Sequence, residues 1–274
     1  MQEHQESKAL KQSVIKKGLL IGINYVGSEN ELNGCINDAN NLKNFLIQIK
    51  YLNANEIIMM NDLLQGAFYP SKANILSQLQ GLVTFAKANT DKIVELFVSY
   101  SGHGTGVRDT NGDEQDGQDE ALVPVDFMQN GFIVDDYLRT NFVDKLPANV
   151  NVVFLCDACH SGTMFDLKYL YQVNASKPEN INPKRTDTKC NVVTISGCRD
   201  DQTSADAYLS NTYQGAMTAA FLANYKDEMT YKVLITKMLT WLTNNRDRFT
   251  QIPQLGSGKK INLDTPFLLS IYNN

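Results

Sequence analysis

The stretch VVFLCDACHSG occupies residues 152–162. Its first half is apolar and β-branched, which is typical of a strand buried on both faces. Its second half is small and polar, and it contains the thiol of Cys159. Open α/β sheets carry their functional groups at the carboxyl ends of the strands. The stretch therefore predicts a buried parallel strand that presents Cys159 at its carboxyl edge.

A second stretch has the same arrangement. Residues 92–100 (KIVELFVSY) favour a strand, and the next four residues, SGHG, contain His103. If the two strands are neighbours, His103 faces Cys159, and a thiol beside an imidazole is the nucleophile pair of a cysteine peptidase. The other histidines are poorer candidates, because His4 lies in a polar tail and His160 directly follows the cysteine.

These residues carry a family resemblance. The blocks SYSGHG (residues 99–104) and CDACHSG (residues 156–162) resemble the caspase/metacaspase superfamily, and most closely its type I metacaspases. The spacing between His103 and Cys159 is also similar to the roughly 50 residues seen in caspases. The resemblance extends from about Lys17 to the C-terminus. It implies a caspase-like three-layer α/β sandwich with a largely parallel central sheet flanked by helices.

Composition places few demands on the function. The chain has 274 residues, 43% of them hydrophobic and 20% charged, which describes an ordinary globular protein. A net charge of −5 predicts neither nucleic-acid nor anionic-membrane partners. The five cysteines are few for a chain of this length and odd in number, which is not typical of a secreted disulfide framework. No secretory or membrane-spanning segment is visible, so we expect a cytoplasmic protein.

Strand-like and helix-like stretches alternate along the chain, as in an α/β fold with a largely parallel sheet. We expect strands at 18–25, 56–60, 92–100, 150–156, 191–196 and 266–272, and helices at 33–49, 70–88, 134–142, 214–225 and 231–246. The acidic residues 108–120 are expected to form a loop. The expected organisation is an N-terminal extension (1–16), a large-subunit-like region (17–172), a linker (173–189) and a small-subunit-like region (190–274).

The resemblance assigns catalytic roles. Cys159 is the expected nucleophile and His103 the base, and the backbone amides of Gly104 and Cys159 are the expected oxyanion donors. The Cys156-x-x-Cys159 pair has an alternative interpretation as a redox or zinc motif. A redox pair normally opens a helix, whereas Cys156 lies within an apolar strand, and we therefore expect Cys156 to pack in the core.

The resemblance also implies a specificity pocket that is formed by Cys35, Asp38, Ser101 and Asp157. Two carboxylates at the floor of a pocket suit Arg or Lys, which predicts protein or peptide substrates with a basic residue at the cleavage site. The alternative interpretations are structural. Asp38 could stabilise the start of a helix, and Asp157 could cap the end of a strand.

Calcium is the expected cofactor. The four aspartates of type I metacaspases that bind it correspond here to Asp119, Asp135, Asp136 and Asp166. Residues 109–120 also partly resemble an EF-hand loop, but Glu114 stands where the turn requires glycine. Two alternatives need no metal: a solvated acidic loop, and an Asp135–Asp136 pair that caps a helix.

A peptidase that prefers Arg or Lys at the cleavage site is also expected to cleave its own chain after basic residues. The linker offers Lys177, Lys184, Arg185 and Lys189, and the N-terminal part offers Lys8, Lys11, Lys16 and Lys17. The block SGCRDDQTSADA (residues 196–207) also matches the family and is expected to shape the substrate groove, with Asp206 as a possible pocket residue. The resemblance implies a monomer. The alternative function is a catalytically silent binding or scaffold protein, which would normally have lost the cysteine or the histidine.

Overall fold

The computed structural model of the protein describes residues 12–110, 112, 117–158, 164–172, 179–198, 207–209, 212–247 and 249–267. In this part of the chain, eight strands form the main sheet in the order β2-β1-β3-β7-β10-β13-β8-β9. The strands are β1 (Val14–Gly22), β2 (Ile57–Asn61), β3 (Ile93–Ser101), β7 (Val150–Asp157), β8 (Tyr169–Tyr171), β9 (Glu179–Ile181), β10 (Asn191–Cys198) and β13 (Ile252–Ser257).

Neighbouring strands from β2 to β10 are parallel, whereas β13 runs antiparallel to β10 and to β8. There are two smaller sheets in the described part of the chain. One consists of β4 (Gly104–Arg108), β5 (Gln118–Leu122) and β6 (Ile133–Val134), and the other consists of β11 (Ala207–Leu209) and β12 (Thr212–Gln214). The predicted α/β fold with a largely parallel central sheet is confirmed.

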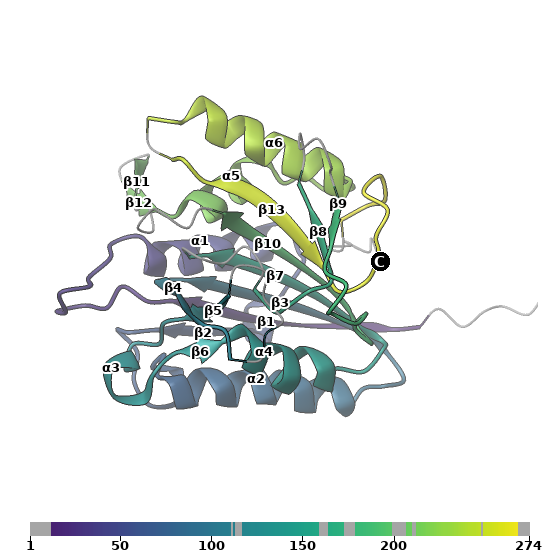
Figure 1. The fold of residues 1–274 in the computed structure, drawn as a ribbon, viewed down its shortest axis with the longest axis horizontal. Coiled ribbons are helices and arrows are strands. Elements are labelled where there is room, and N and C mark those ends of the chain that lie inside the picture. Colours follow the sequence, from purple (N-terminus) through teal and green to yellow (C-terminus); the bar gives the residue numbers. More distant parts are fainter. Residues whose placement is uncertain are drawn as a thin grey trace, which may run out of the picture.

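Helices cover both faces of the sheet (Figure 1). One face carries α1 (Cys35–Gln48), α5 (Ala216–Asn224) and α6 (Tyr231–Asn244), and the other carries α2 (Lys72–Lys87) and α4 (Asp135–Asn141). The short helices are α3 (Phe127–Asn130), η1 (Ala54–Glu56), η2 (Gly66–Phe68) and η3 (Val143–Lys145). The result is three layers with the sheet in the middle.

The central strands are buried on both sides because their apolar side chains alternate between two cores. In β1, Leu19 and Ile21 pack on the side of α2, and Leu20 packs on the side of α1. In β7, Phe154 and Leu155 divide in the same way. A strand that is apolar at every position is stable only between two layers of helices, as its sequence indicates.

Several segments differ from the sequence-based expectation. The ends of the supposed loop at 108–120 lie in β4 and β5, and β13 falls where neither strand nor helix was expected. Part of the supposed linker forms β9, which pairs with β8, and Arg185 and Thr188 beyond it are buried. These short strands form because an existing sheet edge offers hydrogen-bond partners, and local composition carries little of that signal. Of the strand expected at 266–272, residues 268–272 lie outside the described residues.

Candidate active site

The strands that precede the two predicted catalytic residues are neighbours. β3 and β7 pair in parallel with Ser101 opposite Asp157, and the Gly102 amide donates to the Asp157 carbonyl at 3.3 Å. His103 follows two residues after Ser101, and Cys159 follows two residues after Asp157 in the sequence. The predicted pairing of the strands is therefore confirmed. Cys159 itself lies outside the described residues, as does His160.

Two buried tyrosines hold the backbone of His103. The His103 amide donates to the Tyr25 hydroxyl at 2.9 Å, and the Tyr100 hydroxyl contacts the His103 carbonyl at 2.8 Å. The two hydroxyls are 3.1 Å apart, and both also reach the carbonyl of Val123. Burial raises the pKa of both phenols, so they stay neutral hydrogen-bonding groups over the physiological range.

The contacts of the imidazole define its tautomer. The His103 ring packs on the Tyr25 ring, with centroids 4.7 Å apart, and its Nε2 lies 2.8 Å from the carbonyl oxygen of Asn30. A carbonyl oxygen only accepts hydrogen bonds, so Nε2 carries the proton. In the neutral ring, Nδ1 is then the nitrogen with a free lone pair, and it is the atom suited to act as a base.

Asn30 belongs to a turn that is held in place by the side chain of Asp62. Both carboxylate oxygens of Asp62 accept backbone amides at its start, from Asn24 at 3.0 Å and from Val26 at 2.8 Å. Sequence reasoning missed Tyr25, Asn30 and Asp62. A contact that is made through a backbone carbonyl has no residue signature, so the role of Asn30 could be seen only in three dimensions.

Three of the four predicted pocket residues lie together. Asp38 is fully buried, and its carboxylate accepts the Ser101 hydroxyl at 2.6 Å. The Gly215 amide donates to both Asp38 oxygens, at 3.0 and 3.1 Å. A β-carbon at Gly215 would collide with the carboxylates of both Asp38 and Asp157, so the two acids converge on this glycine. The fourth predicted residue, Cys35, is buried one turn earlier on α1.

The N-terminus of α5 lies against both carboxylates. Gly215 is the N-cap of this helix, and Thr218 in its first turn donates its amide to Asp157 at 2.7 Å. Free amides and the dipole at a helix start favour negative charge, so this arrangement stabilises two ionised acids side by side. Sequence reasoning missed Gly215 and Thr218. Both lie within the helix predicted at 214–225, and the sequence around them carries no sign of a contact with the two acids.

The oxyanion residues are described only in part. Gly104 directly follows His103 and opens β4, where it pairs with Leu122 of β5. The other predicted donor is Cys159, which lies outside the described residues together with Asp206, Lys8, Lys11, Lys177 and part of the acidic loop. Cys156 is fully buried in β7, which agrees with a packing role.

The four predicted calcium ligands occupy one region beside α4. Asp119 lies on β5, Asp135 and Asp136 form the first turn of α4, and Asp166 follows β7 in a turn. Asp119, Asp135 and Asp166 are buried. Burial, and then the charge of Asp166, hold the pKa of Asp135 far above its usual range. A cation that prefers oxygen ligands would reduce the repulsion between these carboxylates, so the four aspartates are chemically suited to bind calcium.

In this structure the side chains are not gathered as metal ligands. Within the residues that the structure describes, no three His, Cys, Asp or Glu side chains are close enough together to hold a metal ion. A guanidinium lies among them: Arg185 contacts Asp166 at 2.6 Å and Asp136 at 3.7 Å.

Among the described residues there is no helix with the length and hydropathy needed to cross a bilayer.

Comparison with known proteins identifies relatives over almost the whole chain. Residues 16–168 match the family described as metacaspase, peptidase C14 domain. Metacaspase-1 of Meyerozyma guilliermondii is 34% identical, over 93% of this chain and 72% of its own length. Metacaspase-1 of Kluyveromyces lactis is 37% identical, over 93% of this chain and 68% of its own length.

Solved structures agree on the fold. A protein of Geobacter sulfurreducens aligns with a TM-score of 0.61 at 23% identity, covering 92% of this chain and 97% of that one. Caspase-1 of Spodoptera frugiperda aligns with a TM-score of 0.53 at 14% identity, covering 89% of this chain and 88% of that one. At these identities the likeness concerns the fold alone, and it confirms the predicted caspase-like sandwich. Together with the sequence matches, it follows that the chain belongs to the metacaspase family of cysteine peptidases.

Proposed function

We propose that this protein is a calcium-dependent cysteine endopeptidase that cleaves after Arg or Lys, with Cys159 as the nucleophile and His103 as the base. The register of β3 and β7 carries the proposal. Because Ser101 is opposite Asp157, both strands end at the same edge of the sheet, and His103 and Cys159 each follow the pair by two positions in the sequence. The acidic pair on Gly215 is at that edge too.

The chemistry follows from the tautomer of His103. Nδ1 takes the thiol proton of Cys159, and the sulfur attacks the substrate carbonyl carbon. The tetrahedral intermediate collapses when Nδ1 returns the proton to the leaving amine, which leaves a thioester. Water then gives a proton to Nδ1 and attacks the thioester, which releases the acid product and the thiol. Gly104 and Cys159 are the proposed amide donors to the developing oxyanion.

The acidic pair supports a basic preference. Asp38 is buried and fixed by Ser101 and Gly215, and Asp157 is fixed by Thr218. Each of these hydrogen bonds is donated to a carboxylate oxygen, which favours the charged form of the acid before substrate arrives. A guanidinium or ammonium against two such carboxylates gains on the order of several kcal/mol at a partly buried site.

Calcium is proposed at Asp119, Asp135, Asp136 and Asp166. The ion would supply positive charge to a crowded set of carboxylates and join β5, α4 and the turn at Asp166. Self-processing is proposed in the segment between β9 and β10, where Lys184 and Lys189 are exposed. Lys16 and Lys17 are disfavoured because both lie within β1, paired with β3. We also propose a monomer in the cytoplasm, which sedimentation and cell fractionation would test.

An assay with fluorogenic peptides tests the proposal. Matched peptides with Arg, Lys or Asp before the scissile bond are compared with and without calcium, for the parent protein and for Cys159→Ala and His103→Ala. We expect turnover of the Arg and Lys peptides only, dependence on calcium, and loss of turnover in both variants. Turnover that survives Cys159→Ala would remove the assignment of the nucleophile, and preference for the Asp peptide would remove the acidic pocket.

A further inference from the structure

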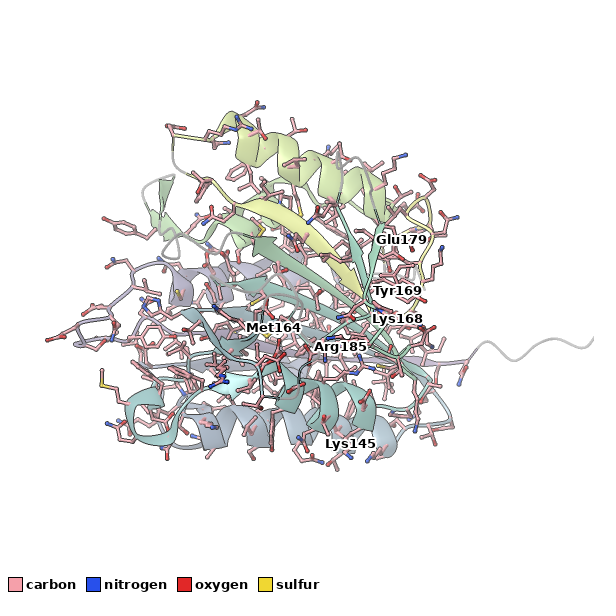
Figure 2. The ribbon with its side chains drawn as sticks, in the orientation of Figure 1. Lys145, Met164, Lys168, Tyr169, Glu179 and Arg185 are labelled. Atoms are coloured by element: carbon pink, nitrogen blue, oxygen red, sulfur yellow. The ribbon has the colours of Figure 1, made fainter. Side chains whose placement is uncertain are left out.

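Arg185 is a basic residue of the supposed linker that is buried in the protein. Its side chain is 8% exposed and forms an ion pair of 2.6 Å with Asp166, whose side chain is 1% exposed. Its other terminal nitrogen lies 3.7 Å from Asp136 in the first turn of α4. In Figure 2 the labelled Arg185 lies beside α4. A guanidinium is buried only when carboxylates compensate for its lost hydration, so these contacts hold it in place.

The segment around Arg185 is docked by further contacts to the same region. Arg139 of α4 donates to the Thr186 carbonyl at 3.0 Å and to the Asp166 carbonyl at 2.7 Å. The preceding residue, Lys184, differs: it is exposed, and its ammonium donates to the carbonyl of Gly112. Of these two adjacent basic side chains, only Arg185 enters the carboxylate cluster.

The guanidinium pairs with two of the four carboxylates that are proposed as calcium ligands, Asp136 and Asp166. The Oδ1 atom of Asp166 is 2.6 Å from Arg185, and a second cation at that oxygen would be strongly repelled by the guanidinium. We propose that Arg185 is a tethered cation that pairs with Asp136 and Asp166 in the cluster of Asp119, Asp135, Asp136 and Asp166, and that a metal ion binds the cluster by displacing it. This inference rests on the calcium site proposed above.

Displacement has a consequence for processing. Once the guanidinium leaves Asp166, the segment keeps its contact with Arg139 but loses its buried ion pair, and Arg185 becomes an accessible basic side chain. Such a residue fits the acidic pair at Gly215. The Arg185–Thr186 peptide bond is therefore a processing site that opens when metal binds, and its hydrolysis by the peptidase consumes one water molecule.

Calorimetry with calcium chloride tests the competition directly. The full chain carries Cys159→Ala so that it stays intact, and it is compared with the same protein bearing Arg185→Gln or Lys184→Gln. Both variants remove one positive charge from adjacent residues. We expect Arg185→Gln to bind calcium at least about tenfold more tightly, because no internal cation has to be displaced. Lys184→Gln should stay within about threefold of the parent.

The outcomes separate the two proposals. Calcium binding that is equal in all three proteins, or weaker in Arg185→Gln, overturns the role of Arg185 and leaves the calcium site standing. Absence of binding in all three overturns both. Binding by Arg185→Gln alone supports the inference, because the parent is then blocked by its own arginine. If Arg185→Gln fails to fold without calcium, Arg185→Lys provides the comparison. Its ammonium carries the same charge but lacks the planar hydrogen-bonding fork of a guanidinium, so it should give an intermediate gain in affinity.

A second measurement follows the segment itself. Trypsin is added to full-length Cys159→Ala/Lys184→Gln protein, in which Arg185 is the basic residue left at this position, and cleavage after Arg185 is followed by mass spectrometry. We expect calcium to accelerate this cleavage by roughly tenfold or more, because a site in a docked segment must first open. An unchanged rate in a protein that binds calcium would overturn the displacement.

Discussion

Ser101 and Asp157 face each other across β3 and β7, each as the last residue of its strand. Both belong to the candidate pocket, and each precedes a predicted catalytic residue by two positions. Because these two parallel strands end at the same level, the residues at their ends lie at the same edge of the sheet. The register of β3 and β7 therefore links the position of the nucleophile pair to that of the specificity pocket.

Removing one pocket carboxylate should impair recognition of basic substrates. We expect Asp38→Asn to lower kcat/KM for an Arg peptide by about 100-fold, because a fixed, buried charge is lost. The measurement is steady-state kinetics on matched Arg and neutral peptides. Asp91→Asn is the control, since this exposed acid precedes β3 at the opposite sheet edge. Unchanged efficiency in Asp38→Asn would contradict the acidic pocket.

A methyl group at Gly215 should disturb the pocket more than the fold. The added carbon meets the carboxylates of Asp157 and Asp38, and at least one must move. We expect Gly215→Ala to lower kcat/KM for the Arg peptide by about tenfold or more. Gly81→Ala is the matched control because its β-carbon meets no atom within 4 Å in the middle of α2. That variant should keep full activity and gain about 0.5–1 kcal/mol in unfolding free energy.

Loss of one tyrosine hydroxyl should misplace His103. Tyr25→Phe removes the acceptor of the His103 amide and a donor to the Val123 carbonyl. We expect kcat to fall by about tenfold with little change in KM, and unfolding free energy to fall by about 1–3 kcal/mol. Tyr137→Phe, at an exposed position on α4, is the control. If Tyr25→Phe changed KM alone, its contact with His103 would have no part in the chemistry.

The buried thiol of Cys190 should make stability fall at alkaline pH. Burial raises its pKa from the ordinary value of 9.0 to about 11, so the folded state keeps its proton longer than the unfolded state. This contribution is complete below pH 9 and is lost as pH rises to about 11, with a maximum of about 3 kcal/mol. Denaturant unfolding at pH 8 and pH 10.5 measures the change. Cys190→Ala is the comparison, and its stability should depend less steeply on pH over this interval. Equal slopes would contradict the raised pKa.

The sequence by itself determined the architecture and the candidate chemistry. Runs of apolar, β-branched residues such as 152–155 are stable only as strands covered on both faces, and polar letters directly after them mark the functional edge. Such signals are local, so they can be read from the chain without knowing its neighbours.

Only the tertiary structure decided how distant parts converge. The amide of Gly215 donates to Asp38, which lies 177 positions away in the sequence. The backbone carbonyl of Asn30 contacts the ring of His103. The side chain of Arg185, in the predicted linker, forms an ion pair with Asp166. None of these contacts has a local signature. The first two use a backbone amide or carbonyl, which is the same in every residue, and the ion pair joins side chains 19 positions apart. The same holds for β9 and β13, which exist because neighbouring strands left hydrogen-bonding edges to be paired.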